Sequence, residues 1–452
     1  MTVICVFTDW DYAVNYLRSA SSASGELVMR ILANKEVKNA GWLIGGKIAQ
    51  MLLSLIVSIF SARLLGPSNY GLVNYGLTYT AFFTSLCYLG LHSIVLKEFV
   101  DNPDQKGLVI GTSLGLRLIS SFCAVVLIFL MSVIIDHGEN ETIIVVVLTS
   151  ISLIFQTFDT FSYFFQANYM SRITAIAGFV GYTVTSCYRI MLLIMGTNVR
   201  WFALSNSVDY IFIAVILIVC YKKHGGPKLH FSFSKGKELL GKSYHFILSG
   251  AMIAIYGQAD KLMLKHYLSQ SAVGLYSVAS SINNAWVFVL SAIVTSLSPT
   301  IMSLYKTNKM LFERKNKQLY CLVFYISTVV AIVFTVLSRF IVSLLYGEQY
   351  IESAGVLAII TWLTAFSYLG VARDPWSVCT NNQKFLKYMY AGAAVLNVIL
   401  NAFMIPRWGI NGAALASLLT QLFTCFIIPL FIRDMRPNVK LMFEAIIFKG
   451  VF

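Results

Sequence analysis

Hydrophobic segments recur along the chain from Gly41 almost to its C-terminal residue. Each is about twenty residues long, which is the length that an α-helix needs to cross the hydrocarbon core of a bilayer. The segments are continuous, whereas the strands of a membrane β-barrel alternate apolar and polar residues over about ten positions. The pattern therefore predicts an all-α polytopic membrane protein with about 12 transmembrane helices.

The predicted spans fall into two sets of six. Windows of about nineteen residues place the first set at 41–62, 72–96, 108–135, 142–165, 173–196 and 201–221. The second set lies at 244–264, 273–304, 319–346, 354–379, 386–405 and 411–432. We therefore expect a cytoplasmic N-terminal extension at 1–38, six-helix lobes at 39–221 and 244–433, a basic cytoplasmic linker at 222–243, and a cytoplasmic tail at 434–452.

The gaps between the spans are alternately rich and poor in lysine and arginine. One set of gaps, with the two ends of the chain, holds 24 of these residues, and the other set holds only Arg63, Arg200, Lys265 and Arg407. Basic residues accumulate on the cytoplasmic side of membrane proteins. The asymmetry predicts that both termini are cytoplasmic. It also accounts for the net charge of +14, so that no nucleic-acid partner is expected.

A similar phrase follows the first span of each set. Residues 62–76 read ARLLGPSNYGLVNYG and residues 265–279 read KHYLSQSAVGLYSVA, with Gly-Leu at the same offset. If the similarity reflects a repeat, the chain forms two parallel six-helix bundles around a central cavity, an architecture that suits alternating access. Chance recurrence of loop and helix-start residues is the alternative interpretation.

Composition narrows the possible functions further. The chain is 58% hydrophobic and 12% charged, and a soluble protein of this size carries roughly twice that charged fraction. The eight cysteines are scattered without metal-ligand or disulfide spacing. The sequence contains no GxxxxGK[ST] phrase and no hydrolase motif, so we expect neither an ATP-driven step, nor an enzyme, nor a cofactor.

Polar side chains within the spans are the candidate functional residues, because a charge in hydrocarbon costs about 2.5–3.5 kcal/mol on the insertion scale. In the first, third, fourth and eighth spans such residues recur every three or four positions and so share one helix face. Helix packing through serine and threonine is the alternative for the uncharged members. The residues that we expect around a transport cavity are Lys47, Arg117, Asp159, Arg189, Asp260, Lys261, Asn284 and Arg373.

Excess positive charge in such a cavity favours an anionic ligand, such as a diphosphate, over a cationic drug. Some of the charged residues must form structural pairs. Arg373 also lies near a span boundary, where a long side chain reaches water easily.

Several phrases resemble those of a known family. They are ARLLGPSNYG (62–71), LGL (89–91), KELLGKS (237–243), ADKLML (259–264), VGLYSVA (273–279), LYGEQY (345–350) and INGAALA (410–416). Because these phrases occur in this order and spacing, the chain resembles the polysaccharide (O-unit) flippases of the multidrug/oligosaccharidyl-lipid/polysaccharide exporter superfamily. The resemblance extends from about Ala40 to Arg433. It departs from the family at Tyr244–Phe246, where a proline often follows KS.

The resemblance implies a function and a location. It implies alternating-access transfer of undecaprenyl-diphosphate-linked oligosaccharide across a bacterial inner membrane, for O-antigen or capsule and exopolysaccharide assembly. It also implies coupling to H⁺ or Na⁺, contact with membrane lipid, and polysaccharide assembly enzymes as partners. Asp260 and Lys261 lie in the matching ADKL phrase, which makes them our first choice for function.

Two other functions are considered. A drug or cation antiporter of the same superfamily would need a pocket rich in carboxylates, whereas the spans of this chain carry mixed or basic charge. A membrane glycosyltransferase or polysaccharide polymerase would be expected to carry a long loop for its chemistry, and the longest internal gap here is short and rich in lysine.

Overall fold

The computed structural model describes residues 35–451, and the predicted extension at 1–38 lies almost entirely outside this range. All regular secondary structure in the described range is helical. The helices of the first half are α4 (Lys35–Cys87), α5 (Leu91–Asp101), α6 (Lys106–Ile135), α7 (Asn140–Ser150), α8 (Ser152–Gln156), α9 (Thr160–Ala167), α10 (Ser171–Ile194) and α11 (Val199–Lys223).

The second half contains α12 (Phe233–Tyr267), α13 (Gln270–Thr307), α14 (Lys309–Tyr346), α15 (Ser353–Ala372), α16 (Asp374–Cys379), α17 (Leu386–Leu422), α18 (Ile428–Phe431) and α19 (Arg436–Ile446). A π-helical segment at Phe423–Ile427 joins α17 to α18. Short 3₁₀ turns lie at Pro103–Gln105, Thr157–Asp159, Glu348–Tyr350, Gln383–Phe385 and Arg433–Met435.

Two of these helices each hold two of the predicted spans. In α4 the backbone breaks at Gly66, where φ is 72° and ψ is 169° immediately before Pro67. In α17 it breaks at Gly409, where φ is 58° and ψ is −138°, three residues after Pro406. A positive φ is accessible to glycine at little cost, and proline removes a helical hydrogen bond, so each pair reverses or kinks the chain.

The predicted number of spans agrees with the structure. Within the described residues, nine helical stretches are long and apolar enough to cross a membrane. Two of them, at 45–99 and 383–431, are 55 and 49 residues long and contain the breaks at Gly66 and Gly409. The less apolar α12 completes the set. The all-helical membrane fold predicted from the sequence is therefore confirmed.

Two predicted spans differ from the structure in their boundaries. The span placed at 72–96 ends as a helix at Cys87, and a turn with Leu89 and Gly90 at positive φ precedes α5. The span placed at 354–379 is interrupted at Arg373, between α15 and α16. Hydropathy does not detect the first turn, because its residues are as apolar as the helices that they join, whereas the second interruption carries the charged residues Arg373 and Asp374.

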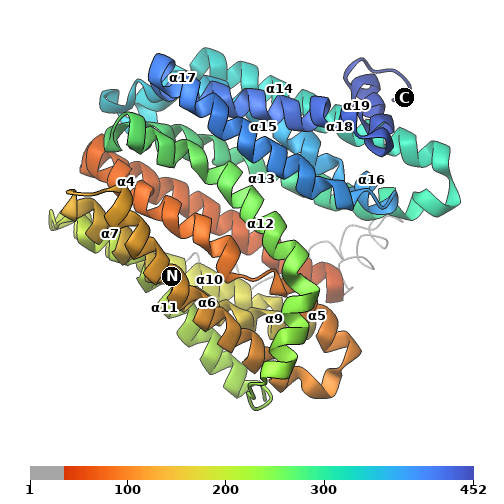
Figure 1. Ribbon diagram of the computed structural model, residues 1–452, viewed down its shortest axis with the longest axis horizontal. Helices are drawn as coiled ribbons and strands as arrows, with labels where there is room; N and C mark the ends of the chain where they lie inside the picture. The colour runs from red at the N-terminus through yellow and green to blue at the C-terminus, as the bar shows by residue number, and fades with distance from the viewer. Residues whose placement is uncertain (1–34, 452) are drawn as a thin grey trace, which may run out of the picture.

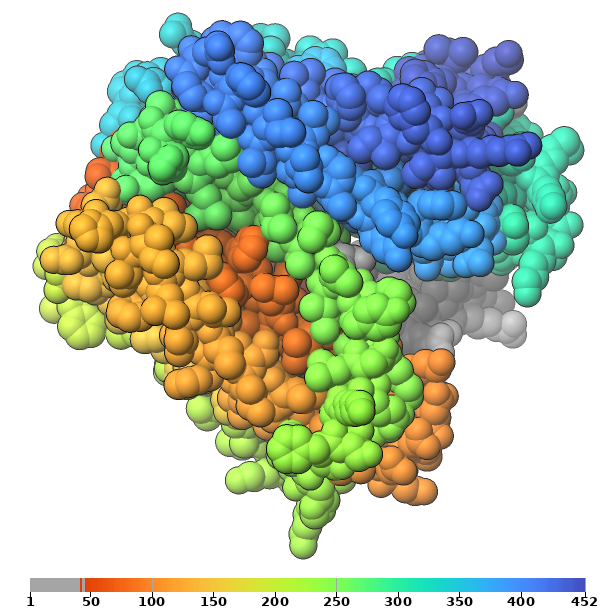
Figure 2. Space-filling view, in the orientation of Figure 1, coloured from red at the N-terminus to blue at the C-terminus, as the bar shows by residue number. Residues whose placement is uncertain are grey.

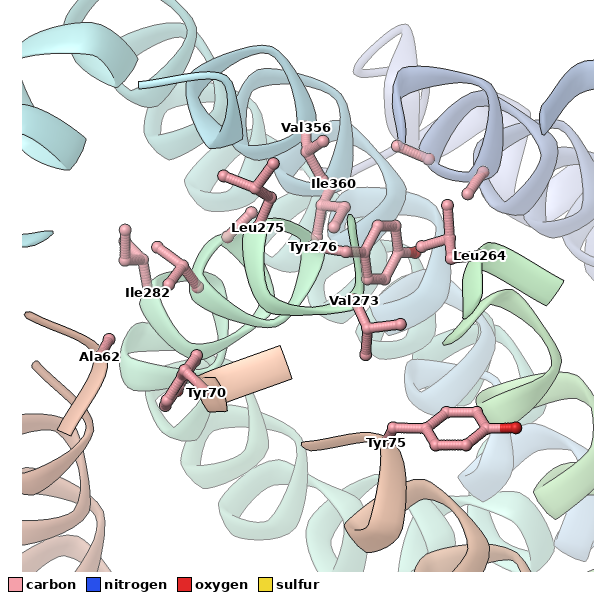
Figure 3. Close-up of a cluster of buried hydrophobic side chains, with 14 of the residues drawn as sticks. Ala62, Tyr70, Tyr75, Leu264, Val273, Leu275, Tyr276, Ile282, Val356 and Ile360 are labelled. Atoms are coloured by element: carbon pink, nitrogen blue, oxygen red, sulfur yellow. The ribbon is translucent and has the colours of Figure 1, made fainter. Parts of the chain in front are cut away.

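The helices form two bundles that share a core at one end only (Figure 1). The shared core combines residues of α4, α6 and α7 with residues of α12–α15 and α17. Figure 3 shows part of it, with Tyr70 and Tyr75 of α4 near Val273 and Ile282 of α13. Away from this end each bundle has its own core, one within 91–239 and the other within 294–451.

The repeated phrases meet at the shared core. A Cβ atom on Gly71 would lie 1.9 Å from the carbonyl oxygen of Gln270, and one on Gly274 would lie 2.3 Å from that of Pro67. Small residues allow membrane helices to approach this closely. Gly71 and Gly274 occupy the same offset in the two phrases, and their contacts are reciprocal, as a two-fold axis between two copies would produce. We call this end of the molecule, residues 62–76, 136–142, 265–279 and 344–355, the closed end.

Helix α12 belongs to both bundles (Figure 2). Near its start, Lys235 and Lys242 bind the buried carboxylate of Glu98 on α5, at 2.7 and 2.6 Å. Leu239 lies in the core of the first bundle, whereas Leu264 lies in the shared core. The first turns of α12 therefore fall within the predicted linker at 222–243, and the helix continues through 244–246 without the family proline.

The last segment of the chain is an ordered part of the second bundle. Helix α19, within the predicted tail at 434–452, packs on α14, and Lys317 pairs with Glu444 at 2.5 Å. Tyr325 donates a hydrogen bond to the carbonyl of Ile446 at 2.7 Å. These contacts fix the predicted tail against the bundle.

The glycine contact predicts how the closed end responds to an added methyl group. Gly71→Ala places a Cβ against backbone, and overpacking of this kind costs about 1–3 kcal/mol. We expect the variant to open the closed end more often, raising the rate at which an impermeant maleimide labels a cysteine at Ser281 in a cysteine-free background. Gly241→Ala, where a Cβ meets no atom within 4 Å, is the matched control. Equal labelling of the two variants would contradict the assignment.

Candidate functional site

Hydrogen bonds to backbone carbonyls hold the two bundles together at the closed end. The Arg63 guanidinium at the end of the first span donates through Nε to the carbonyl of Leu345 at 2.8 Å and through Nη2 to that of Leu344. The Tyr350 hydroxyl donates to the carbonyl of Ala62 at 2.8 Å. These carbonyls belong to the last turns of helices, where the backbone has no hydrogen-bond donor of its own helix to pair with.

A charged contact also crosses the bundles at this end. Lys265, at the end of α12, pairs with Glu139 before α7 at 2.7 Å, and Gln270 donates to Thr142 at 2.8 Å. The hydrogen bond from Lys265 lowers the pKa of Glu139 below its ordinary value. The pair therefore persists at neutral pH, but the exposed Glu139 limits its contribution to at most about 1 kcal/mol.

Two cavities with polar side chains in their linings lie between the helices. The first, about 320 Å³, is lined by α12, α13, α15 and Ser417 of α17, and includes Asp260, Lys261 and Asn284. We call it the C-cavity. The second, about 170 Å³, is lined by both spans of α4, by Tyr182 and Arg189 of α10, by Phe202 of α11 and by Ser281 of α13. We call it the N-cavity.

Neutral hydrogen-bond donors surround the Asp260 carboxylate beside the C-cavity. Its Oδ2 accepts hydrogen bonds from Tyr276 and Ser417, both at 2.6 Å. Its Oδ1 accepts from the amides of Asn401 at 2.7 Å and Asn397 at 3.2 Å. The residue is 7% exposed. Four hydrogen bonds satisfy the carboxylate, yet within the described residues no cation lies within ion-pair distance of it.

Lys261 and Asn284 line the same cavity. Lys261 is half-buried, and no carboxylate of the described residues lies within ion-pair distance of its ammonium group. Successive residues on a helix point about 100° apart, so Lys261 does not reach the Asp260 oxygens. The structure thus brings three of the predicted residues to one cavity, with an amine that is available to a ligand.

Arg189 lines the N-cavity through a different set of partners. Its Nε donates to Ser205 Oγ at 2.8 Å and its Nη2 donates to Asn206 Oδ1 at 2.6 Å, both on α11. These neutral acceptors orient the guanidinium and leave its charge uncompensated by direct pairing. The serines of the first predicted polar stripe, Ser54, Ser58 and Ser61, line the same cavity.

Arg117 is placed differently from the cavity residues. It is 1% exposed, and its Nη1 donates to Thr160 at 2.8 Å and to Tyr163 at 3.2 Å. Its Nη2 donates to the carbonyl of Gln156 at 3.1 Å, and the guanidinium stacks over the Tyr88 ring at 4.3 Å. These contacts join α6 to the last residue of α8 and to α9. The geometry favours an anchoring role for Arg117 within the first bundle.

The remaining predicted residues lie apart from both cavities. Asp159 falls in the 3₁₀ turn after α8 and Lys47 is exposed on α4. Arg373, 2% exposed, lies between α15 and α16 with Nε and Nη1 buried and unpartnered in the described part of the chain. The lining of neither cavity includes these three side chains.

Sequence reasoning did not identify the residues that surround Asp260. Asn397 and Asn401 come from the eleventh predicted span, Ser417 from the twelfth and Tyr276 from the eighth. A signal was present, because two asparagines four residues apart in a hydrophobic span share a helix face.

The sequence of the chain is similar to the sequences of known proteins. A family model described as "Polysaccharide biosynthesis protein" matches residues 37–305. The capsular polysaccharide biosynthesis protein CapF of Staphylococcus aureus is 20% identical over 398 residues, covering 85% of this chain and 96% of that protein. A protein of Shigella flexneri described as an O-antigen transporter is 22% identical over 398 residues, covering 84% and 93%.

The fold is similar to that of solved transporters. The lipid II flippase MurJ, in an inward closed conformation, has a TM-score of 0.71 with 15% identity, covering 90% of this chain and 92% of that one. The helices thus define a multi-pass membrane protein. The chain belongs to the polysaccharide biosynthesis protein family, as the sequence phrases predicted.

The different placements of Arg117 and Lys261 predict different effects on stability when each side chain is removed. Arg117→Met deletes three hydrogen bonds from a charged donor, each worth about 1.5–3 kcal/mol, so we expect loss of folded protein and a lower melting temperature in detergent. Lys261→Met removes a cavity amine without a close partner, and its melting temperature should stay near that of the wild type. Equal stability of the two variants would contradict the anchoring role of Arg117.

Proposed function

We propose that the protein transfers undecaprenyl-diphosphate-linked oligosaccharide units across a bacterial inner membrane, for O-antigen or capsule and exopolysaccharide assembly. The observation that carries this proposal is the pair of cavities with a cation and hydroxyl groups in their linings, one in each of two bundles joined at one end, in a chain of the polysaccharide biosynthesis protein family. The names of the relatives from Staphylococcus aureus and Shigella flexneri agree with a glycan substrate.

The cavity linings suit a glycan joined to an anion. Serine, asparagine and tyrosine side chains supply donors and acceptors that can replace the water around sugar hydroxyls, while Lys261 and Arg189 supply positive charge. The polyprenyl chain needs no polar path, because it is as apolar as the surrounding lipid. Only the head group therefore has to pass between the bundles.

The distribution of lysine and arginine supports an orientation of the protein in the membrane. The closed end carries Arg63 and Lys265, which belong to the basic-poor set of loops, and so faces outward in our proposal. The bundles have separate cores at the other end, which then faces the cytoplasm. The structure corresponds in this proposal to a state that receives substrate from the cytoplasmic leaflet and is closed to the outside.

Asp260 is the proposed site of coupling to H⁺ or Na⁺. Its carboxylate is held by neutral donors, and the Oδ1 atom of Asn401 beside it is buried without a partner in the described residues. A buried anion with a free neighbouring acceptor favours binding of a small cation or a proton. Occupation would rearrange the donors on α13 and α17 around α12, the helix that belongs to both bundles.

A transport assay tests the proposed substrate. Purified protein in liposomes should move a fluorescent undecaprenyl-diphosphate-linked glycan between leaflets, measured as the fraction of label quenched by an impermeant reductant. Lys261→Ala should lower the rate at least tenfold, because it removes the available cavity amine. Arg407→Ala, an exposed residue in a basic-poor loop, is the control. Transport of organic cations and none of the glycan would instead favour the antiporter.

The coupling proposal predicts a separate effect of Asp260→Asn. The amide keeps the size of the side chain but cannot bind a cation as a carboxylate does. We therefore expect the variant to lose the acceleration that a Na⁺ or proton gradient gives the wild type, while it remains folded by thermal melting. A variant that responds to both gradients as the wild type does would place coupling elsewhere.

A further inference from the structure

Arg373 is a charged side chain enclosed in the apolar core of the second bundle. It is 2% exposed and lies between the last residue of α15, Ala372, and the first residue of α16, Asp374. Ala372 and Trp376 belong to the core within 294–451. In this part of the bundle α16, α18 and α19 lie together, at the opposite end from the shared core (Figure 1).

The guanidinium of Arg373 has no hydrogen bond to a residue that the structure describes. Its Nε and Nη1 atoms are buried without a partner. Arg117 is buried to the same extent, and its guanidinium donates three hydrogen bonds and stacks over the ring of Tyr88. The chain therefore supplies acceptors to one buried arginine and none, among the described residues, to the other.

The charge of Arg373 also has no direct counterpart. No carboxylate of the described residues lies within the 4.0 Å of an ion pair with it. Asp374 is next to it in the sequence and is exposed. Because successive residues on a helix point about 100° apart, Asp374 lowers the positive potential at Arg373 without occupying its N–H groups.

Titratable groups of three other elements lie near enough to interact electrostatically with the guanidinium. They are Tyr320 of α14, Tyr390 of α17 and Cys425 of the π-helical segment. Phenol and thiol groups are neutral at pH 7. None of these three groups therefore compensates the positive charge.

Two neutral side chains in the same region also have unpartnered atoms. Ser377 follows Arg373 by four residues and so shares its helix face, and its backbone N–H donates to the Arg373 carbonyl at 3.0 Å. Asn438 of α19 donates through Nδ2 to the Tyr320 hydroxyl at 2.7 Å. The Ser377 Oγ and Asn438 Oδ1 atoms are buried without a hydrogen bond to a described residue. Such atoms are uncommon in proteins, and they indicate a position for water or an ion.

The positive charge distinguishes an ion from water at this position. An arginine side chain does not lose its proton in a protein, so burial cannot neutralise it as it neutralises a lysine. Water would satisfy the N–H groups but would leave a full charge in apolar surroundings, which is costly. An anion satisfies both the N–H groups and the charge. It has to be small, because Arg373 is almost fully enclosed.

We propose that Arg373 binds a small monovalent anion, such as chloride, within the second bundle. The guanidinium N–H groups and the Ser377 hydroxyl are its donors. The anion connects the interruption between α15 and α16 to α14 and α19, which meet there through Tyr320 and Asn438. The π-helical segment with Cys425 lies at the same position, and π-helical turns occur frequently at functional sites. The site is separate from the C-cavity, whose lining does not include Arg373.

Thermal melting of the full-length protein in a neutral detergent tests the site. Chloride replaces gluconate at constant sodium concentration and ionic strength, so that cation binding at Asp260 does not vary. The melting temperature of the wild type should rise with chloride and saturate, because the ligand binds the folded state. That of Arg373→Met should not respond. Arg407→Met, which removes an exposed arginine of the same bundle, should respond as the wild type does.

The same variant distinguishes a ligand site from an internal anchor. Without chloride, Arg373→Met should melt at or above the temperature of the wild type, since an apolar side chain replaces an uncompensated buried charge. Ser377→Asp is the second variant. It keeps the arginine and places a carboxylate on the same helix face, so it should also abolish the response to chloride.

Direct detection of the ion keeps the test independent of how the variants fold. Bromide replaces chloride in crystals of the wild type, and its anomalous scattering should locate an ion beside Arg373. The absence of this signal, or an equal chloride response in the wild type and Arg373→Met, would overturn the proposal. A response that Arg189→Gln loses and Arg373→Met keeps would also overturn it and would place the anion in the N-cavity.

Discussion

The close approach of two backbone segments at Gly71 and Gly274 is the constraint on which the rest of the structure depends. Any side chain at either position would collide with a carbonyl of the opposite bundle. The contact gives the two bundles a common core at one end, and they separate from there into independent cores. A helical protein that is closed at one end and divided at the other can change the exposed side of its interior when that contact breaks and the other end closes, without unfolding either bundle.

The charges inside the protein are divided between the two bundles. In the second bundle Asp260 is held by neutral hydroxyls and amides, and Lys261 is available beside it. In the first bundle Arg189 faces a cavity lined by hydroxyls. If these charged groups formed ion pairs with one another, they would not be available to a ligand. Keeping them apart costs stability in hydrocarbon.

Much of this organisation could be predicted from the sequence. Hydropathy and the distribution of lysine and arginine predict the number of spans, and the repeated phrase predicts two six-helix bundles. That the two copies of the phrase meet at the closed end could not be predicted. The turn at Leu89 and Gly90 could not be predicted, because it is as apolar as its neighbours. Arg117 and Arg189 look alike in sequence, yet one is an internal anchor and the other lines a cavity. That difference depends on which helices pack together, as does the meeting of Asn401 with Asp260.

In our proposal, transport requires the bundles to separate at the closed end while the other end closes. Pulsed electron paramagnetic resonance between spin labels at His137 and Glu352, exposed residues of opposite bundles at this end, measures that separation directly. We expect one short distance in the free protein and a second, longer distance when lipid-linked glycan and a cation gradient are supplied. A single unchanged distance under conditions in which the same sample transports glycan would contradict the account.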